Sequence, residues 1–327
     1  MAARQSVPVI GPQIPREEIG STGESWLSPR RFSLSVGYRY QHSHRHFIGT
    51  EEQADRAEQM TEVNNRIHII DFAGTYEVNN QLSVSLSVPF FFAKRYSQRT
   101  PDQVTHGYGI GDISIVARRW LLRNPSESRQ NIAVGFGVKL PTGRYDVTDT
   151  VTSPAGPVRR VIDQSIQPGD GGFGLVAELQ AYKAVKSVRL FASGVYLSNP
   201  RGTNGVPTGR SRPSEAIMSV ADQYLYRVGA VAPLPKVRSL AWTVSLRGEG
   251  VPSRDLIGDS NGFRRPGYAL SLEPGLIFTK GKQSWSFSVP VAVRRDRTRS
   301  VPDILDNRHG DAAFADYIIL VGYSRHF

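Results

Sequence analysis

The sequence predicts an all-β protein: a single antiparallel up-and-down transmembrane β-barrel of about twelve strands, with short periplasmic turns and long external loops. Three observations predict this fold class. Segments of about 9–13 residues alternate apolar and polar side chains, and this is the length of a tilted membrane strand. The connections between these segments alternate between short and long. The chain also ends on an alternating segment whose last residue is aromatic.

The C-terminal segment 316–327 is the clearest of these patterns. Successive side chains of a strand point to opposite faces, and one parity of this segment is apolar or aromatic: Tyr317, Ile319, Val321, Tyr323 and Phe327. The ending resembles the closing strand of bacterial outer-membrane barrels. We therefore expect the barrel-assembly machinery to recognise Phe327. The alternative is the terminal strand of a soluble sandwich, which also alternates.

Composition excludes several classes of protein. Charged residues make up 21% of the 327 residues, and the mean hydropathy is -0.32. No apolar run reaches roughly 18 residues, so a transmembrane helix is not expected. A membrane barrel remains open, because its alternating strands average to a modest hydropathy. Cysteine is absent, which excludes disulfides and thiolate metal sites.

The formal net charge is +11, from 40 Lys and Arg against 29 Asp and Glu. Such a balance is typical of nucleic-acid-binding proteins, but the basic residues are spread along the chain and no such motif is present. A basic lumen, or contact with anionic headgroups of outer-membrane lipid and lipopolysaccharide, accounts for the same charge. We therefore expect lipid and small-molecule partners and no nucleic acid.

The N-terminal segment 1–30 is rich in Pro, Gly, Ser and charge. We expect it to form an irregular periplasmic tail or a plug, followed by the barrel over residues 31–327. The segment lacks the apolar core of a signal peptide. Because an outer-membrane protein is exported, this expectation requires either a mature form with an added Met1 or a misplaced start codon.

The predicted strands can be placed in chain order by their period of two. In segment 82–92, for example, Ser83, Ser85 and Ser87 alternate with apolar residues. The full set is 31–40, 66–77, 82–92, 111–122, 132–140, 172–184, 187–198, 221–232, 240–250, 268–279, 285–294 and 315–327.

The connections separate a membrane barrel from a sandwich. Short connections are expected at 78–81, 124–130, 185–186, 233–239 and 281–283, and long ones at about 42–65, 97–110, 141–171, 199–220, 251–267 and 295–314. Outer-membrane barrels have short periplasmic turns and long external loops. An even number of strands places both termini on the periplasmic side.

Three glycine-rich stretches resemble a known family. They are GYGIGDISIVARRWLL at 107–122, VGFGVKLPTGRYD at 134–146 and QPGDGGFGLVAELQAYK at 167–183. In order and spacing, the sequence from about residue 70 onward resembles the outer-membrane barrel family labelled for the meta-pathway of phenol degradation. Most members of that family are described as transporters. The resemblance implies a porin-like barrel and uptake of small molecules, among them aromatic compounds.

Parity along the predicted strands indicates which charged side chains point into the lumen. They are Arg39, Asp112, Lys139, Glu178, Arg227, Arg247, Glu249, Glu273 and Arg294. Two interpretations stay open: a salt-bridged network that fills the barrel, or a charged, water-filled path that selects solutes. At about twelve strands the interior lies between that of an eight-stranded barrel and that of a porin.

The longest predicted connection, 141–171, carries Arg144, Arg159 and Arg160. A folded loop and side chains could close an interior of the expected width. We expect this connection to fold over or into the mouth of the barrel and to gate it.

Three histidines form the one candidate for a metal site. His42, His44 and His46 alternate, so on a continuing strand they would share a face and could bind a metal through imidazole nitrogens. The only carboxylates nearby are Glu51 and Glu52, in a predicted loop. A solvated external rim is therefore the favoured interpretation, and we predict no cofactor.

Three further stretches are interpreted as turns or strand entries. GDSNG at 258–262 matches G-x-S-x-G, but Ser260 lies in a predicted loop, and a nucleophile elbow needs a strand, a turn and a helix. The glycine-rich stretches 107–112 and 168–172 lead into strands, whereas phosphate-binding loops lead into a helix N-terminus. We therefore predict that the protein is not an enzyme.

The function predicted from these patterns is passage of small solutes, anionic or aromatic, through a charged lumen in the bacterial outer membrane. Two alternatives remain. One is a barrel without transport activity whose long loops bind a surface partner. The other is an outer-membrane lipid hydrolase.

Overall fold

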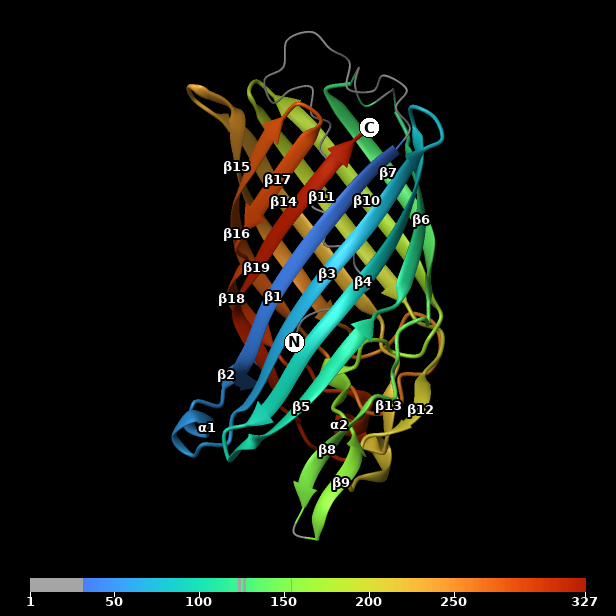
Figure 1. Cartoon of the computed structure of the whole chain (residues 1–327), viewed down its shortest axis with the longest axis vertical. Coiled ribbons are helices and arrows are strands. Elements are labelled where there is room, and N and C mark those ends of the chain that lie inside the picture. Colours follow the sequence, from blue (N-terminus) through green and yellow to red (C-terminus); the bar gives the residue numbers. More distant parts are fainter. Residues whose placement is uncertain (1–31, 123–124, 126–127, 154) are drawn as a thin grey trace.

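The computed structural model describes residues 32–327 except 123–124, 126–127 and 154, so the predicted N-terminal segment 1–30 lies outside the described residues. The described residues form one closed antiparallel barrel with twelve strand positions (Figure 1). None of the helices in the described ranges is long and apolar enough to cross a membrane. The predicted fold class is confirmed.

Neighbours in the barrel follow chain order. The strands are β1 (Phe32–Ile48), β3 (Val63–Glu77), β4 (Leu82–Ser97), β5 (Thr100–Ile110) with β6 (Ile113–Trp120), β7 (Gln130–Leu140), β10 (Gly174–Val185), β11 (Val188–Ser198), β14 (Gln223–Leu234), β15 (Val237–Val251), β16 (Gly267–Lys280), β17 (Gln283–Ser288) with β18 (Val291–Asp296), and β19 (Ala312–His326). The pairs β5–β6 and β17–β18 each fill one position, because both members pair with the same neighbouring strand, β4 or β16.

The first and last strands close the barrel. β1 and β19 pair antiparallel from Ser33 opposite His326 to Phe47 opposite Ala312. At this seam the backbone N–H of Phe327 donates to the carbonyl of Phe32 (3.1 Å), and the two rings lie 6.1 Å apart. Closure satisfies the backbone groups that an edge strand would leave without partners.

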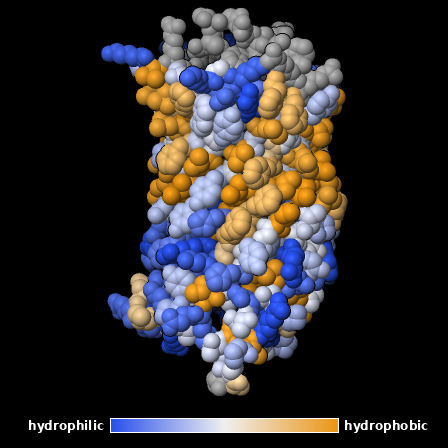
Figure 2. Space-filling model, viewed as in Figure 1, coloured by the Kyte–Doolittle hydropathy of each residue, from blue (hydrophilic) through white to orange (hydrophobic). Residues whose placement is uncertain are grey.

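The apolar face of each strand points outward. Leu34 and Leu86 are each 45% exposed, Phe136 is 70% exposed and Val291 is 46% exposed. These residues come from four strands and do not meet in a central core. Polar and small residues of the opposite parity, such as Ser87, are buried inside. Figure 2 shows apolar side chains gathered over the half of the barrel next to the short turns.

Tight turns join the strands at one end of the barrel. Lys186, Lys236 and Gly281 lie in turns of two residues and have φ values of 54°, 71° and 56°. Positive φ is what tight hairpin turns require. An apolar cluster of Tyr182, Phe191, Val231 and Ala241 lies inside the barrel towards this end.

The opposite end carries the long connections, several of which contain further structure (Figure 1). These elements are β2 (Glu51–Glu52), α1 (Asp55–Glu58), β8 (Thr148–Ser153), β9 (Gly156–Val161), η3 (Gln164–Ile166), β12 (Thr203–Pro207), η4 (Pro213–Glu215), β13 (Ile217–Ser219) and α2 (Val301–Leu305). The predicted alternation of short turns and long connections is therefore present.

Two predicted connections are shorter than expected. Residues 97–110 are largely strand, because β4 continues to Ser97 and β5 returns from Thr100 with the register Lys94 opposite His106. β1 likewise continues to Ile48 and β3 begins at Val63, so the connection predicted at 42–65 is reduced. Polar residues interrupt the apolar alternation in these stretches, so the sequence did not identify them as strand. Figure 1 shows the resulting extension of β1, β3, β4 and β5 beyond the neighbouring wall.

Candidate solute pathway in the barrel lumen

A network of ion pairs crosses the middle of the lumen. Arg39 of β1 contacts Glu249 of β15 at 2.7 Å, although three strand positions separate these strands around the barrel. Glu249 also contacts Arg247 at 2.6 Å. Glu273 of β16 contacts Arg227 at 2.7 Å and Arg247 at 3.6 Å. Three guanidinium groups therefore share two carboxylates, which leaves one surplus positive charge.

A second pair lies on the opposite wall. Arg118 of β6 reaches Glu178 of β10 at 2.5 Å, across the intervening strand β7. The residue of β7 between them is Gly135, which stands opposite both Arg118 and Glu178, and an added Cβ on Gly135 would lie 3.0 Å from the Cβ of Glu178. The small side of β7 therefore provides the room that this ion pair occupies.

The three glycine-rich motifs meet at the mouth of the barrel. The ammonium group of Lys139 is fully buried and lies 2.5 Å from Asp170 and 3.6 Å from Asp112. The Asp112 carboxylate accepts hydrogen bonds from the backbone N–H of Gly143 (3.0 Å) and of Asp170 (3.2 Å). The motifs therefore act together as an anchor for the connection between β7 and β10.

Glycine is needed where the backbones of this anchor touch. A Cβ on Gly169 would lie 2.3 Å from the carbonyl oxygen of Gly143, and a Cβ on Gly143 would lie 2.8 Å from the Cα of Gly169. Both distances are shorter than a Cβ tolerates. Gly143 and Gly169 thus permit the two ends of the 141–171 connection to pack closely against each other.

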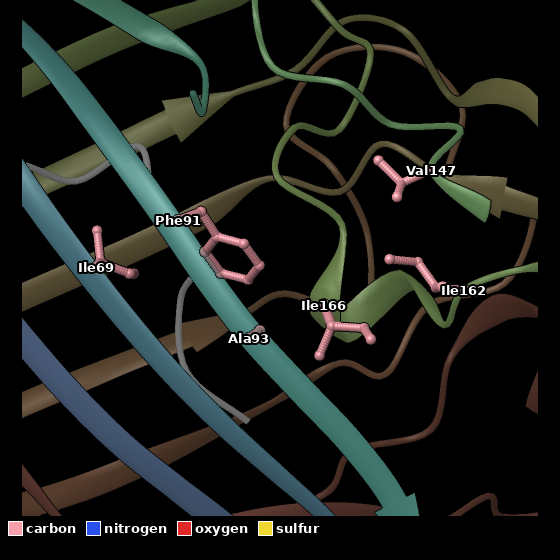
Figure 3. Close-up of a cluster of buried hydrophobic side chains, with 6 residues drawn as sticks. All are labelled: Ile69, Phe91, Ala93, Val147, Ile162 and Ile166. Carbon is pink, nitrogen blue, oxygen red and sulfur yellow. The ribbon is translucent and has the colours of Figure 1, made fainter. Parts of the chain in front are cut away.

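Part of this connection folds into the barrel. Ile162 and Ile166 are buried against Ile69 and Phe91 on the inner wall formed by β3 and β4. Figure 3 shows the connection residues facing the wall residues, with Val147 and Ala93 completing the cluster. We name residues 162–170 the inward segment. The apolar contact anchors it on one side of the lumen.

Asp163 anchors the inward segment on its polar side. Its two carboxylate oxygens accept hydrogen bonds from Arg265 at 2.9 and 2.8 Å, and Arg95 of β4 lies 3.5 Å away. Burial alone would raise the pKa of Asp163, but the charges of Arg265 and Arg95 outweigh it and place the pKa well below its ordinary value. The carboxylate is therefore ionised at neutral pH.

A cavity of about 250 Å³ lies between the inward segment and the mid-lumen network. Six arginines line it, whereas its lining contains two carboxylates, Asp170 and Asp311. The arginines are Arg39, Arg56, Arg95, Arg210, Arg264 and Arg265. Ile67, Ile69 and Phe91 form an apolar part of its wall. The cavity thus combines a basic surface with an apolar one.

Eight of the nine side chains predicted to face the lumen are buried in the three ion-paired groups described above. Arg294 departs from the prediction. A β-bulge shifts the register of β18, so that Arg294 stands opposite Leu270 on the exposed face, two residues from the exposed Leu272. Arg295 takes the partly buried position and contacts Asp316 at 2.7 Å. One extra residue reversed the parity on which the prediction depended.

The side chains of the arginines predicted to gate the mouth are exposed and do not line the cavity described above. Arg144 is exposed and 3.6 Å from Asp146, and Arg159 donates to the hydroxyl of Thr148 on the β8–β9 hairpin. Arg160 is also exposed. The part of the connection that enters the barrel is the inward segment, which follows these residues.

The three histidines of β1 have different partners. His42 contacts the side chain of Asn64 at 2.9 Å and stacks on His44 at 4.5 Å. His46 instead contacts Asp311 at 2.7 Å. Irregular register with β19 around Ser43 separates their directions, and no cluster of three metal-ligating side chains occurs among the described residues.

Ser260 lies in the connection between β15 and β16. Its hydroxyl accepts a hydrogen bond from the backbone N–H of Asp255 at 2.8 Å. Asp255 in turn binds the buried Arg264 through both carboxylate oxygens. This arrangement is that of a turn that fixes the position of Arg264 at the cavity.

Sequence reasoning missed several residues of the cavity and its anchor, among them Arg95, Asp163, Arg210 and Arg265. Arg95 belongs to the stretch of β4 that was predicted to border a loop. The other three lie in connections, where parity gives no direction. The run of basic residues at 264–265 was the one signal available, and it did not indicate a partner.

Comparison with known proteins supports the fold. No protein-family model and no curated protein matches the chain, so the predicted family label has no support from either comparison. Among solved structures, an outer-membrane channel from Pseudomonas putida F1 matches with a TM-score of 0.59 and 10% identity, over 94% of this chain and 100% of that one. This likeness establishes that the chain has the barrel fold of that channel.

Two further solved structures match less well. The β domain of a Bordetella autotransporter has a TM-score of 0.49 at 11% identity, over 91% of this chain and 100% of that one. A toluene transporter from Ralstonia pickettii has a TM-score of 0.42 at 9% identity, over 92% of this chain and 90% of that one. With TM-scores under 0.5, neither carries an argument about function.

Proposed function

We propose that the chain is an outer-membrane channel through which small organic anions pass, among them anions with an aromatic group. The observation that carries the proposal is the cavity at the mouth, where arginines outnumber carboxylates and face an apolar wall. A cation-rich, partly apolar cavity favours a solute that has both a negative charge and an apolar body.

The membrane placement rests on the outer face of the barrel. Apolar side chains there are largely exposed on strands all around the barrel, which is unusual for a protein surrounded by water. They include Leu34, Phe72, Leu86, Phe136, Leu179, Val228, Leu246, Leu276, Phe287, Val291 and Val321. In lipid this surface is favourable, and the closed barrel leaves no unpaired sheet edge. The same placement makes Phe327, at the closing seam, the proposed contact for the assembly machinery.

Shared carboxylates explain why the pathway stays basic. Asp163 serves Arg95 and Arg265, and Glu215 and Asp303 together serve Arg210, Arg297 and Arg308. Each of these groups carries one surplus positive charge, as does the mid-lumen network. The Lys139 site carries the opposite surplus, because two carboxylates surround one ammonium group. The net charge summed over the cavity and the mid-lumen network is positive, which favours anions.

The inward segment supplies a constriction in this proposal. It occupies one side of the mouth and is fixed by Asp163, Asp170 and the isoleucine contact. A solute would pass between it and the arginines of the cavity. Below this level the Arg39–Glu249 pair crosses the lumen and forms the second narrow point. The pathway needs no covalent step and no cofactor, so the proposal assigns no catalytic residue.

The reversal potential in planar bilayers tests the proposal. With purified protein in a KCl gradient, we expect preference for chloride over potassium, and a reduced chloride current when benzoate is added. Arg210→Gln removes a cavity arginine whose guanidinium lies 3.5 Å from Glu215 and 3.8 Å from the centre of the Phe263 ring. We expect it to lower the anion preference about twofold, because one surplus charge is lost.

Arg159→Gln is the matched control, since Arg159 is exposed on the hairpin and outside the cavity lining. Its selectivity should equal that of the wild type. Cation preference in the wild type, or absence of conductance in correctly folded protein, would contradict the proposal. Benzyl alcohol in place of benzoate separates the charge requirement from the aromatic one.

A further inference from the structure

The outer face of β1, β3, β4 and β5 carries three successive rows of side chains near the long-connection end. Residues directly opposite one another on neighbouring strands define each row. From the middle of the barrel outward, the rows are Tyr38, Ile70, Phe90 and Ile110; then Tyr40, His68, Phe92 and Tyr108; then His42, Arg66, Lys94 and His106. The order is thus apolar, aromatic and basic.

These rows point away from the lumen. Phe92 and Tyr108 are 46% and 71% exposed, whereas Phe91 and Gly107, which alternate with them, are buried. Opposite residues of an antiparallel pair share a face, so the basic row lies on the outer surface as well. We name His42, Arg66, Lys94 and His106 the basic row.

The carboxylates near the basic row lie at its two ends. Asp149 lies 3.3 Å from His106 at one end, and the charge of Glu62 acts on His42 at the other. Glu62 also accepts a hydrogen bond from Gln98. Within the described residues, no carboxylate lies within ion-pair distance of Arg66 or Lys94, and the buried Nε of Arg66 has no hydrogen-bond partner.

Such a row is unfavourable without an anion. Like charges directly opposite one another destabilise a sheet, and Arg66 and Lys94 stand directly opposite. His44, stacked on His42, adds a further ionisable group to the same patch. An external anion that contacts several of these side chains would remove the repulsion and supply the missing acceptor for Arg66.

The basic row is confined to this wall. On the opposite wall, the row nearest the long connections is Tyr196, Tyr224, Gly250, Tyr268 and Asp296. That row is aromatic and ends on a carboxylate. A general feature of the barrel rim would place basic residues on both walls, so the contrast indicates a localised site.

We infer that the basic row binds the phosphate groups of a phosphorylated outer-leaflet glycolipid, whose acyl chains lie on the aromatic and apolar rows below. This inference rests on the outer-membrane placement proposed above. Four neighbouring strands span about 14 Å, which suits a headgroup with two separated phosphates. Arginine and lysine bind phosphate oxygens, and aromatic side chains favour the boundary between headgroup and hydrocarbon.

Lipid binding by a double variant tests the inference. The full-length protein in detergent is titrated with bis-phosphorylated lipid A, and binding is followed by native mass spectrometry. In Arg66→Gln with Lys94→Gln, we expect affinity about tenfold weaker, equivalent to about 1.4 kcal/mol. The wild type should bind the same lipid with both phosphates removed as weakly as the double variant binds the intact lipid.

The matched control replaces two outward basic residues near the short turns. Arg119 and Lys183 are exposed on β6 and β10, and Arg119→Gln with Lys183→Gln should leave binding unchanged. Equal loss in both double variants, or equal binding of intact and dephosphorylated lipid, would overturn the inference. So would unchanged binding in the variant of the basic row. Far-ultraviolet circular dichroism confirms that each variant is folded.

The same samples separate this inference from the proposed channel. The double variant of the basic row should keep the anion preference of the wild type, because its side chains lie outside the lumen. Phosphate-dependent lipid binding without any conductance would reject the channel and support the lipid site. Anion conductance with no phosphate-dependent lipid binding would support the channel and reject the lipid site.

Discussion

Two groups of ion pairs lie in the lumen, and they differ in whether barrel strands or a connection carry their carboxylates. In the mid-lumen network, Glu249 and Glu273 and their arginine partners all lie on barrel strands. At the mouth, Asp163 and Asp170 lie on the 141–171 connection and bind Arg265, in the connection between β15 and β16, and Lys139, on β7. The difference indicates that loss of the mid-lumen network should weaken the barrel. Loss of the ion pairs at the mouth should release only the inward segment.

The largest expected effect is on the network. Glu249→Gln leaves Arg39 and Arg247 buried without a full counter-charge. Breaking a buried ion pair on one side costs about 3–5 kcal/mol. We expect a decrease of this size in the free energy of unfolding, measured in urea by tryptophan fluorescence. Glu52→Gln is the control, because the Arg45–Glu52 pair is one-third exposed and should contribute at most about 1 kcal/mol. Equal losses would show that the network does not support the barrel.

The next effect is on conductance. Asp163→Asn removes the charge that binds Arg265 and Arg95, so the inward segment should leave the wall more often. We expect a larger single-channel conductance with little change in the unfolding of the barrel. Asp146→Asn alters an exposed carboxylate of the same connection and should leave conductance unchanged. If Asp163→Asn conducts like the wild type, the inward segment does not restrict the path.

A smaller effect is expected from packing in the anchor. Gly169→Ala places a Cβ 2.3 Å from the Gly143 carbonyl oxygen, so the connection must shift. Overpacking of this kind costs about 1–3 kcal/mol. Here we expect that cost to weaken the docking of the connection on the barrel. We expect faster hydrogen exchange over 141–171. Gly194→Ala, where an added Cβ meets nothing within 4 Å, provides the comparison. Unchanged exchange in Gly169→Ala would mean that the glycines are not required at this contact.

The smallest effect concerns pH. The pKa of Asp163 is lower in the folded protein than its ordinary value, so its contribution to docking is complete above about pH 4. The contribution declines as pH falls towards the depressed folded pKa, because the unfolded carboxyl binds its proton first. The contribution of Asp163 to the conductance should therefore be constant from pH 7 to about pH 5, and its loss should raise the conductance only in stronger acid. In Asp163→Asn this acid-dependent rise should be absent.

Much of the barrel could be predicted from the sequence. Twelve alternating segments and the contrast between short and long connections identified the strands and their neighbours. Parity placed Arg39, Lys139 and Glu273 inside, because the direction of a strand side chain depends only on its position in the strand. Arg294 shows the limit, since one bulge reverses the parity of all that follows it.

The site at the mouth could be predicted only in part. The sequence predicted that the 141–171 connection folds over or into the mouth, but the residues it singled out were Arg144, Arg159 and Arg160. The residues that enter the barrel are Ile162 and Ile166, and their partners Ile69 and Phe91 lie far away in the chain. Sequence periodicity does not indicate which part of the barrel wall a connection packs against.

The sequence by itself determined the closed sheet and its two faces, because alternation of side chains is a local property of every strand. Only the tertiary structure decided which charges meet: Arg39 with Glu249 across the lumen, and Asp163 with Arg265 at the mouth. These pairs join residues more than 100 positions apart. Their formation depends on the curvature and register of the whole barrel, and no single segment contains that information.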